Sequence, residues 1–239
     1  HTVTLADRPK PCPAAGPTPD AVMALQERWR ARGGASERLE VLDRIAGIDV
    51  GYSKDGSRMQ AAVVVLDRAS LEPLDTAIAA GVPNFPYTPG LLSFREVPLV
   101  VAALEKLTVL PEAIVCDGQG LAHPRRFGLA CHLGVLLDVP AIGVAKSHYV
   151  GEYETVGRDR GSWEPLQDRA IGGNSEDETI GAVVRTQADV KPVYVSIGHR
   201  FGLETAIELA IELAPRYRLP ETTRQADRLS RQFYTKPGK

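Results

Sequence analysis

The sequence has no apolar run long enough to cross a membrane, few cysteines and no large excess of charge. No segment approaches the roughly 18 consecutive apolar residues of a transmembrane helix. The three cysteines, Cys12, Cys116 and Cys131, have neither an even count nor metal-site spacing, so we expect no disulfide and no zinc site. The net charge of -2 argues against a protein that coats itself with nucleic acid. The first residues lack the order of a signal peptide, so we expect a cytoplasmic protein with no membrane partner.

What is present is the composition of an ordinary globular protein. Hydrophobic residues make up 44% of the 239 and charged residues 24%, which is enough to bury the core of one domain. Residues 1–18 are rich in proline, alanine and glycine and are predicted to form a flexible arm. Pro19, capped by Thr18, is predicted to open a helix that ends at Gly33. We therefore predict a single domain over residues 19–239.

The hydrophobic pattern changes its period along the chain, and this change predicts the fold class. Three strand-like segments separated by short turns indicate an antiparallel meander. Helix and strand patterns then alternate, which indicates parallel pairing of the two strands concerned. The predicted elements are strands at 45–53, 59–67 and 71–80, a helix at 94–107, a strand at 113–117, a helix at 127–137, a strand at 141–145, a loop at 151–177, strands near 180–185 and 192–198, and a helix at 203–214. The prediction is an α/β fold with a mixed central sheet flanked by helices.

Three acidic residues are placed differently from ordinary surface carboxylates. Asp49 in the stretch GIDVGYS is predicted to end the first strand, Asp117 to end the strand AIVCD, and Glu96 to begin a helix. Such positions converge on one rim of an α/β sheet, where sites form. Each also has a plainer interpretation, because aspartate beside glycine is common in turns and Ser93 with Glu96 matches a capping box.

Taken together, the three carboxylates favour a metal site. Like charges gathered on one rim cost stability unless a cation neutralises them. Oxygen ligands without a Cys/His cluster indicate Mg²⁺ or Mn²⁺. A divalent ion held by carboxylates suits the hydrolysis of phosphate esters.

Two loops add features of a nucleic-acid enzyme. Tyr87 lies on the proline-braced loop PNFPYTPGLLSFRE, outside any periodic segment. DGQGLAHPRRFG follows Asp117 with two glycines, which allow close backbone approach to a ligand, and continues with His123, Arg125 and Arg126. An aromatic wedge, a glycine-lined pocket and paired arginines fit an enzyme that displaces a base and cuts a nearby phosphodiester.

Two charge patterns also have plainer interpretations. Glu204, Glu208 and Glu212 lie four residues apart on one helical face, which is typical of a solvated surface. Basic residues outnumber acidic ones after residue 215, which is consistent with either a solvated tail or a phosphate-facing surface. These basic residues are Arg216, Arg218, Arg224, Arg228, Arg231, Lys236 and Lys239.

Four motifs in order resemble the endonuclease V family, the deoxyinosine 3' endonucleases. They are GIDVGYS, PYTPGLLSFRE, DGQGLAHPRRFGLACHLGVLLDVPAIGVAKS and RLPETTRQAD, and the resemblance spans residues 25–234. It implies a ribonuclease H-like fold and a DNA repair enzyme that uses Mg²⁺, with Mn²⁺ able to substitute. It also implies cleavage of the second phosphodiester 3' to deoxyinosine, leaving 3'-hydroxyl and 5'-phosphate ends, by a monomer.

The resemblance carries the metal-binding carboxylates of the family onto Asp49, Glu96, Asp117 and Asp227. Asp227 occupies a place where members have either His or Asp. Without the family, Asp227 would be interpreted as an ion-pair partner of nearby arginines on a helix.

The remaining site residues also follow from the resemblance. Lys146 resembles a catalytic lysine near the scissile phosphate, although alone it would be interpreted as a strand-end lysine with its charge in solvent. His123 resembles a pocket histidine with a catalytic role, and Tyr87 resembles the wedge that fills the gap left by the extruded base. Further substrate-binding positions are Pro86, Pro89, Gly90, Leu91, Gly118, Gln119, Gly120, Leu121 and Arg125.

One position departs from the family, and several rival functions stay open. Many members have DGHG where this chain has DGQG, and the amide of Gln119 can form hydrogen bonds but cannot titrate.

GIDVGYS also resembles the first phosphate loop of actin-like ATPases, but that class needs two such domains and this chain has room for one. The pattern is also compatible with a non-catalytic nucleic-acid-binding domain of the same fold and with an inosine-specific ribonuclease.

Overall fold

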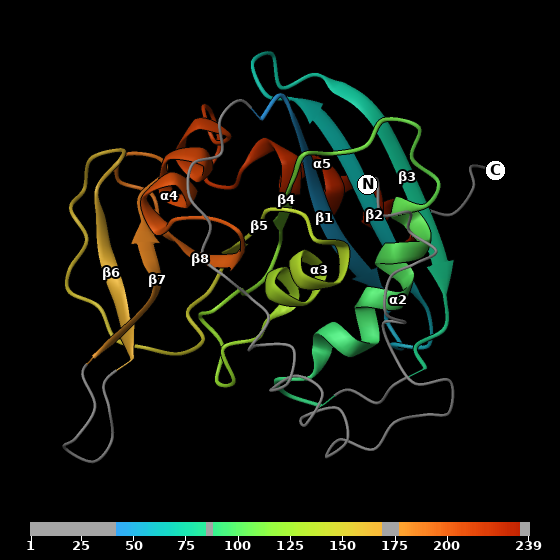
Figure 1. The fold of residues 1–239 in the computed structure, drawn as a ribbon, viewed down its shortest axis with the longest axis horizontal. Helices are drawn as coiled ribbons and strands as arrows, with labels where there is room; N and C mark the ends of the chain where they lie inside the picture. The colour runs from blue at the N-terminus through green and yellow to red at the C-terminus, as the bar shows by residue number, and fades with distance from the viewer. Residues whose placement is uncertain (1–41, 85–87, 169–176, 235–239) are drawn as a thin grey trace.

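The structure is a computed structural model that describes residues 42–84, 88–168 and 177–234 (Figure 1). Its strands are β1 (Arg44–Tyr52), β2 (Met59–Asp67), β3 (Pro73–Gly81), β4 (Ala113–Cys116), β5 (Ala141–Ala145), β6 (Trp163–Asp168), β7 (Glu178–Val184) and β8 (Val193–His199). Its helices are α2 (Leu92–Leu104), α3 (Leu129–Leu137), α4 (Leu203–Glu212), α5 (Glu221–Ser230) and the 3-10 helix η2 (Arg231–Tyr234). No helix in these ranges is both long and apolar enough to span a membrane.

The strands form one mixed sheet in the order β3-β2-β1-β4-β5-β8-β7-β6. β1, β2 and β3 are the predicted antiparallel meander. β1, β4 and β5 run parallel, and β8, β7 and β6 extend the sheet in antiparallel fashion. The predicted α/β fold with a mixed, ribonuclease H-like central sheet flanked by helices is confirmed.

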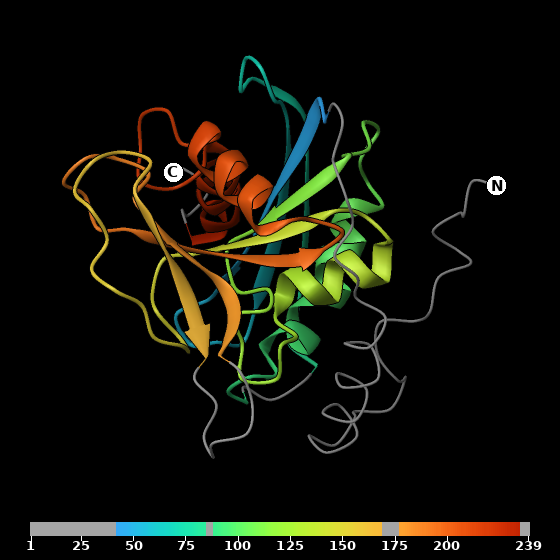
Figure 2. The ribbon, with the colours of Figure 1, turned by 60° about the vertical axis from the view of Figure 1, so that its left-hand side comes forward.

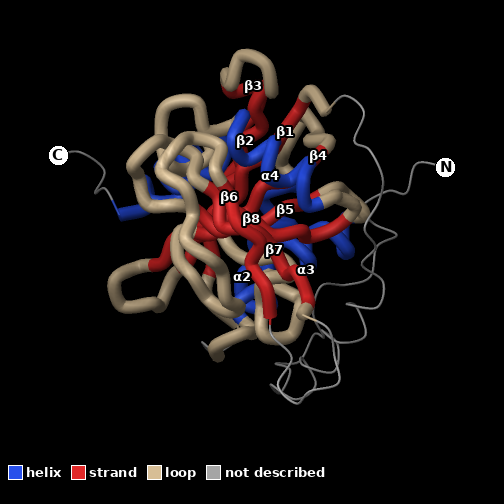
Figure 3. Tube along the Cα trace, turned by 90° about the vertical axis from the view of Figure 1, so that its left-hand side faces the viewer, coloured by secondary structure: helices blue, strands red, loops and turns tan. Residues whose placement is uncertain are grey.

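Helices cover both faces of the sheet. Figure 2 shows the green helices α2 and α3 on one side of the sheet and the red helices α4 and α5 on the other. Ile48 of β1 belongs to the core under α2 and α3, whereas Ile45 belongs to the core under α4. Side chains of a strand alternate between its two faces, so odd-numbered residues of this part of β1 point toward α4 and α5. Figure 3 shows the strands at the centre of the molecule with helices around them.

The main difference from the predicted elements is a strand within the segment expected to be a loop. β6 pairs antiparallel with β7 at the edge of the sheet. Only Leu166 of this strand is buried, so the segment WEPLQD lacks the apolar alternation that would have indicated a strand. The helix predicted to begin at Pro19 lies outside the described residues.

The two glycines that flank Asp49 allow α5 to lie directly against β1. A Cβ atom added at Gly47 would lie 2.0 Å from the backbone oxygen of Thr222, and one added at Gly51 would lie 3.0 Å from the backbone oxygen of Ser230. Any side chain at Gly47 would therefore displace the helix. The glycine pattern of GIDVGYS explains the close helix–strand contact that brings α5 to Asp49.

Candidate active site

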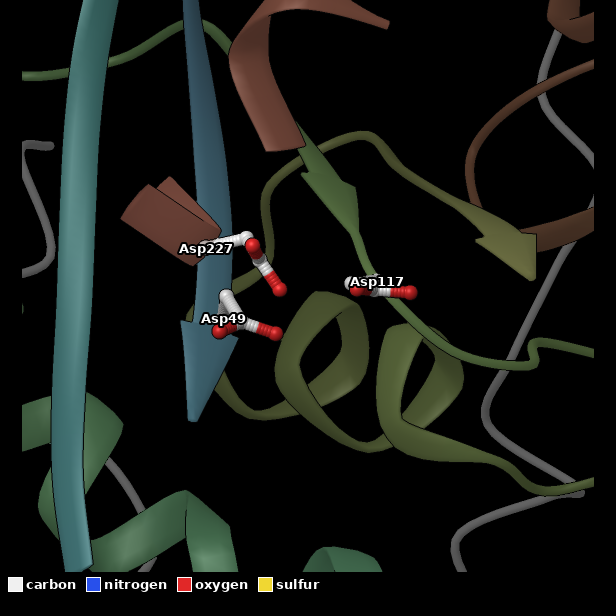
Figure 4. A group of neighbouring side chains, drawn as sticks. All are labelled: Asp49, Asp117 and Asp227. Atoms are coloured by element: carbon white, nitrogen blue, oxygen red, sulfur yellow. The ribbon is translucent and has the colours of Figure 1, made fainter. Parts of the chain in front are cut away.

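Three aspartates from three separate elements meet at one end of the parallel strands. One carboxylate oxygen from each of Asp49, Asp117 and Asp227 lies within 4.8 Å of the others. Figure 4 shows Asp49 on β1 and Asp227 on α5 pointing into the gap beside Asp117. The register explains the first pair: Ile48 is aligned with Cys116, and the amide of Asp117 donates to the Ile48 oxygen at 3.1 Å, so Asp49 and Asp117 lie side by side. Asp49 lies within β1, which stays paired with β2 as far as Tyr52, so Asp49 is not in a turn and the prediction that it ends the strand is wrong.

Two cationic side chains contact this carboxylate cluster. Lys146, directly after β5, places Nζ against Asp117 Oδ2 and 3.2 Å from Asp227 Oδ1. Partial burial lowers the pKa of Lys146, but the two carboxylates outweigh burial and the pKa is raised. Arg231 donates from Nη2 to Asp227 Oδ1 at 2.8 Å. Lys146 therefore stays protonated beside two of the three carboxylates.

Ser230, at the end of α5, orients Asp49. Its hydroxyl donates to Asp49 Oδ2 at 2.5 Å, and the residue is fully buried. Gln60 of β2 donates to the backbone oxygens of Leu229 and Ser230, and so satisfies carbonyl groups that the end of a helix leaves unpaired. Burial raises the pKa of Asp49 to about 6, the Ser230 hydrogen bond opposes that rise, and the charges of Asp117 and Asp227 add to it.

Glu96 approaches the aspartates from the opposite face of the sheet. It is on α2, is 6% exposed, and accepts a hydrogen bond from the Tyr52 hydroxyl at 2.8 Å. Burial raises the pKa of Glu96 to about 8, and the Asp49 and Asp117 charges raise it further, against the hydrogen bond from Tyr52. Glu96 is thus close enough for the charges of Asp49 and Asp117 to raise its pKa. It does not belong to the group of three carboxylates whose oxygens lie within 4.8 Å of one another.

The capping-box interpretation of Ser93 and Glu96 is wrong. Helix α2 begins at Leu92, two residues before the predicted start, and its N-cap residue Leu91 makes no side-chain capping bond. The hydroxyl oxygen of Ser93 instead lies 3.2 Å from Nδ1 of the buried His132, and the Glu96 carboxylate accepts a hydrogen bond from the Tyr52 hydroxyl. Neither side chain caps the helix.

A cavity of about 400 Å³ opens beside Glu96 and Asp117. This volume is within the range of small-molecule sites, about 300–1,000 Å³. The lining residues are Pro89, Gly90, Leu92, Ser93, Glu96, Asp117, Gly118, Gln119, His123, Gly128, Leu129, Ser147, His148 and Tyr149. Two loops predicted to bind substrate therefore border one cavity next to the carboxylate cluster.

His123 and Arg125 join these two loops. Burial lowers the pKa of His123 to about 4, the positive charge of Arg125 lowers it further, and the ring is neutral at pH 7. His123 Nδ1 accepts from the backbone amide of Arg125 at 3.1 Å, so the ring proton is on Nε2. Arg125 Nη1 donates to the Gly90 oxygen at 3.3 Å, and Gly90 has a φ of +78°, which favours glycine.

Gln119 lines the cavity and has a buried acceptor atom. Its Nε2 donates weakly to the Ser147 oxygen at 3.4 Å, while its buried Oε1 has no hydrogen-bond partner among the residues described. A buried acceptor is costly unless it is paired. The acceptor is enclosed by the protein, so a ligand N–H in the cavity would pair with it only after the Gln119 side chain turned.

Arg126, the second of the paired arginines, connects the pocket loop to the edge of the sheet. Its guanidinium contacts Asp168 of β6 and donates to Glu178 of β7 at 2.8 Å, and it donates to the His123 oxygen at 2.9 Å. Its side chain is 11% exposed. The contacts of Arg126 therefore hold the loop that contains His123 against β6 and β7.

The other predicted substrate residues have mixed positions. Pro86 and Tyr87 lie outside the described residues. Leu91 is fully buried, and Gly120 packs so close to β8 that an added Cβ would lie 2.1 Å from the Ile197 oxygen. Leu121 packs with a small cluster around Phe127. Leu91, Gly120 and Leu121 therefore pack against neighbouring parts of the protein and are not among the residues that line the cavity.

Sequence reasoning missed several residues that contact the site. Ser147, His148 and Tyr149 line the cavity directly after Lys146, and the strand-end rule that identified Asp117 could have indicated them. Ser230 and Tyr52, which bind Asp49 and Glu96, carry no pattern in the sequence.

Comparison with known proteins agrees with this geometry. The endonuclease V family model matches residues 25–228. Endonuclease V of Trichormus variabilis is 46% identical over 224 residues, which are 93% of this chain and 97% of that protein. The crystal structure of endonuclease V from Streptomyces avermitilis has a TM-score of 0.84 and 47% identity, and the match covers 93% of this chain and 96% of that chain.

A more distant relative has been crystallised with nucleic acid. Endonuclease V of Ciona intestinalis, in complex with a 24mer DNA containing an inosine followed by a ribo-adenosine, has a TM-score of 0.74 and 27% identity, over 88% of this chain and 95% of that chain. The family match extends over most of the sequence, and the relatives align over nearly their whole length. This chain therefore belongs to the endonuclease V family.

Proposed function

We propose that this chain is a DNA repair endonuclease that recognises deoxyinosine and hydrolyses the second phosphodiester 3' to it, leaving 3'-hydroxyl and 5'-phosphate ends. The observation that carries the proposal is the meeting of Asp49, Asp117 and Asp227 within 4.8 Å, beside a cavity that can hold a base. The Ciona intestinalis relative, whose DNA contains an inosine, supports the choice of lesion.

The carboxylate cluster fits a divalent cation bound by oxygen. Three carboxylate oxygens from independent elements approach within 4.8 Å, and the two cations that contact them in the described part of the chain, Lys146 and Arg231, leave one of the three negative charges uncompensated. We propose Mg²⁺, with Mn²⁺ as a substitute, held by Asp49, Asp117 and Asp227 with Glu96 beside them. When bound, such an ion would polarise the phosphate and activate water.

Lys146 is proposed to stabilise charge that develops on the phosphate. Its ammonium group already lies beside Asp117 and Asp227, where a phosphodiester bound to a cation held by these carboxylates would come. A fixed positive charge at this point needs no rearrangement during the reaction, which is the condition for effective electrostatic catalysis.

The adjoining cavity is proposed to receive the displaced base. His123 and Arg125 fix the two loops that border it, and the Gln119 side chain, whose buried Oε1 has no partner among the described residues, would turn to accept from a base N–H. In this proposal His123 shapes the pocket with a neutral ring, and Tyr87 fills the gap that the base leaves in the duplex.

The direct test is strand nicking of a duplex with one deoxyinosine in the presence of Mg²⁺. We expect a single nick at the second phosphodiester 3' to the lesion, no nick in the matched duplex with adenine, and no nick with EDTA. Denaturing gels give the position, and phosphatase and ligase treatment identify the ends. Binding without nicking would favour a non-catalytic nucleic-acid-binding domain, and stronger cleavage of the same sequence as RNA would favour the ribonuclease.

Ser230→Ala is expected to lower Mn²⁺ affinity by about 10- to 100-fold, as removal of the outer partners of metal ligands generally does. The Ser230 hydrogen bond holds down the pKa of Asp49, so the loss should be largest near and below pH 6, where protons compete with the ion. Calorimetric titration at pH 6 and pH 8 measures both effects.

The matched control for this change is Ser70→Ala. Ser70 also donates to an aspartate, Asp67, at 2.7 Å, but at the other end of β2. Equal Mn²⁺ affinity in both variants and in the unchanged protein would remove Ser230 from its positioning role.

A further inference from the structure

A second cavity lies on the other side of the carboxylate cluster. It encloses about 570 Å³, and Asp49 and Asp227 line it, whereas Asp117 lines the first cavity. Because oxygens of all three lie within 4.8 Å of one another, the cluster forms the boundary between the two cavities. A ligand that extends from the first cavity past the cluster can therefore reach the second.

The two cavities differ in charge. The first is lined by the carboxylates Glu96 and Asp117, with no lysine or arginine among its described lining residues. The second is lined by three cations, Lys54, Lys146 and Arg231, against the two carboxylates Asp49 and Asp227. The first therefore suits a neutral base, and the second suits an anion.

Lys54 is presented by a well-ordered turn between β1 and β2. The carboxylate of Asp55 accepts from the hydroxyl of Ser53 at 2.6 Å, and from the amide of Ser57 at 3.1 Å and its hydroxyl at 2.8 Å. Arg95 of α2 donates to the Gly56 oxygen at 3.3 Å and so ties the turn to the helix. A fixed turn reduces the entropy that binding would otherwise cost.

Arg231, in the 3-10 helix η2, is the third cation that lines the second cavity. Its contact with Asp227 uses one of the five guanidinium N–H groups, and its side chain is 66% exposed. Arginine donors in this geometry are suited to phosphate oxygens.

We propose that the second cavity binds the phosphodiester backbone immediately 3' of the cleaved bond, with Lys54 and Arg231 as its contacts. This rests on the proposed function, because the base occupies the first cavity and the cut lies 3' to the base. The strand then runs from the first cavity, across the carboxylates, into the second. Lys54 thereby fixes the direction in which the strand crosses the cluster.

The test pairs Lys54→Gln with single neutral linkages in the DNA. Methylphosphonates are placed one at a time at each linkage on both sides of the deoxyinosine, and binding is followed by fluorescence anisotropy in EDTA. In the unchanged protein we expect a neutral linkage just 3' of the cut to weaken binding roughly 3- to 10-fold, as for a charge-assisted contact. In Lys54→Gln that same linkage should have a clearly smaller effect, because only Arg231 then contacts the phosphate, and the salt dependence should correspond to about one phosphate contact fewer.

Lys106→Gln is the matched control, because Lys106 lies beyond the far end of α2 and donates to the Ile78 oxygen. It should behave as the unchanged protein at every linkage. Arg231→Gln should lose sensitivity at the same linkage or its neighbour. Equal sensitivity of Lys54→Gln and the unchanged protein at every linkage, or coupling only to linkages 5' of the lesion, would overturn the proposal.

A failure of the proposed function gives a different result. Nicking assays on the unmodified duplex would then show no cut beside deoxyinosine, whatever the anisotropy series shows. Because the anisotropy series requires no cleavage, coupling between Lys54 and a 3' linkage is measured independently of activity.

Discussion

Asp117→Asn is expected to slow nicking beside deoxyinosine on the order of 10³-fold or more, without unfolding the protein. Asparagine has nearly the shape of aspartate, but it removes one charge from three carboxylates whose oxygens lie within 4.8 Å, and it weakens the contact with Lys146. Asp49→Asn should have a similar effect. Single-turnover nicking at saturating Mg²⁺ measures the rate, and anisotropy in Ca²⁺ should still show lesion binding, because the cavity is intact.

Glu208→Gln is the control for loss of one carboxylate. Glu208 is exposed on α4 and is not part of the carboxylate cluster, so the Glu208→Gln protein should nick at the rate of the unchanged protein. Mg²⁺-dependent nicking by Asp117→Asn at the rate of Glu208→Gln would refute the assignment of the carboxylate cluster as the catalytic centre.

The sheet could be predicted because its central strands carry a strong signal. β2 and β5 match their predicted bounds, since apolar strands buried on both faces read as continuous apolar runs. β6 was missed because it lies at the edge of the sheet, with a single buried side chain. Sequence pattern reports burial, and an edge strand has little of it.

The candidate site was predictable to the extent that it follows from strand register. Asp49 and Asp117 lie next to each other because Ile48 of β1 is aligned with Cys116, the last residue of the parallel strand β4. Asp227 came only from the family resemblance, because it reaches the site through the packing of α5 on Gly47, more than 170 residues away along the chain. The partners Ser230 and Tyr52 depend on side-chain geometry that no spacing reveals.

Glu96→Gln is expected to abolish most nicking and yet to stabilise the metal-free protein at alkaline pH. The pKa of Glu96 rises from 4.5 to about 8, mainly through burial, so the folded protein binds a proton that the unfolded chain releases. The extra proton bound by Glu96 therefore stabilises the folded protein at low pH, and this stabilisation is lost as the pH increases from about 4.5 to about 8. Glutamine can still accept from Tyr52 and never ionises, so the difference in the free energy of unfolding above pH 8 should be on the order of 5 kcal/mol.

Thermal unfolding in EDTA across the pH range measures this effect. At pH 5 the two proteins should unfold at nearly the same temperature, and at pH 9 Glu96→Gln should unfold roughly 10–20 °C higher. Added Mn²⁺ should narrow the gap, because an ion that binds only the folded state stabilises the ionised carboxylates of the unchanged protein. Glu208→Gln should show no pH-dependent difference, because Glu208 is exposed. Identical unfolding temperatures of Glu96→Gln and the unchanged protein at pH 9 would mean that Glu96 does not carry a buried charge, and its place beside the carboxylate cluster would need another explanation.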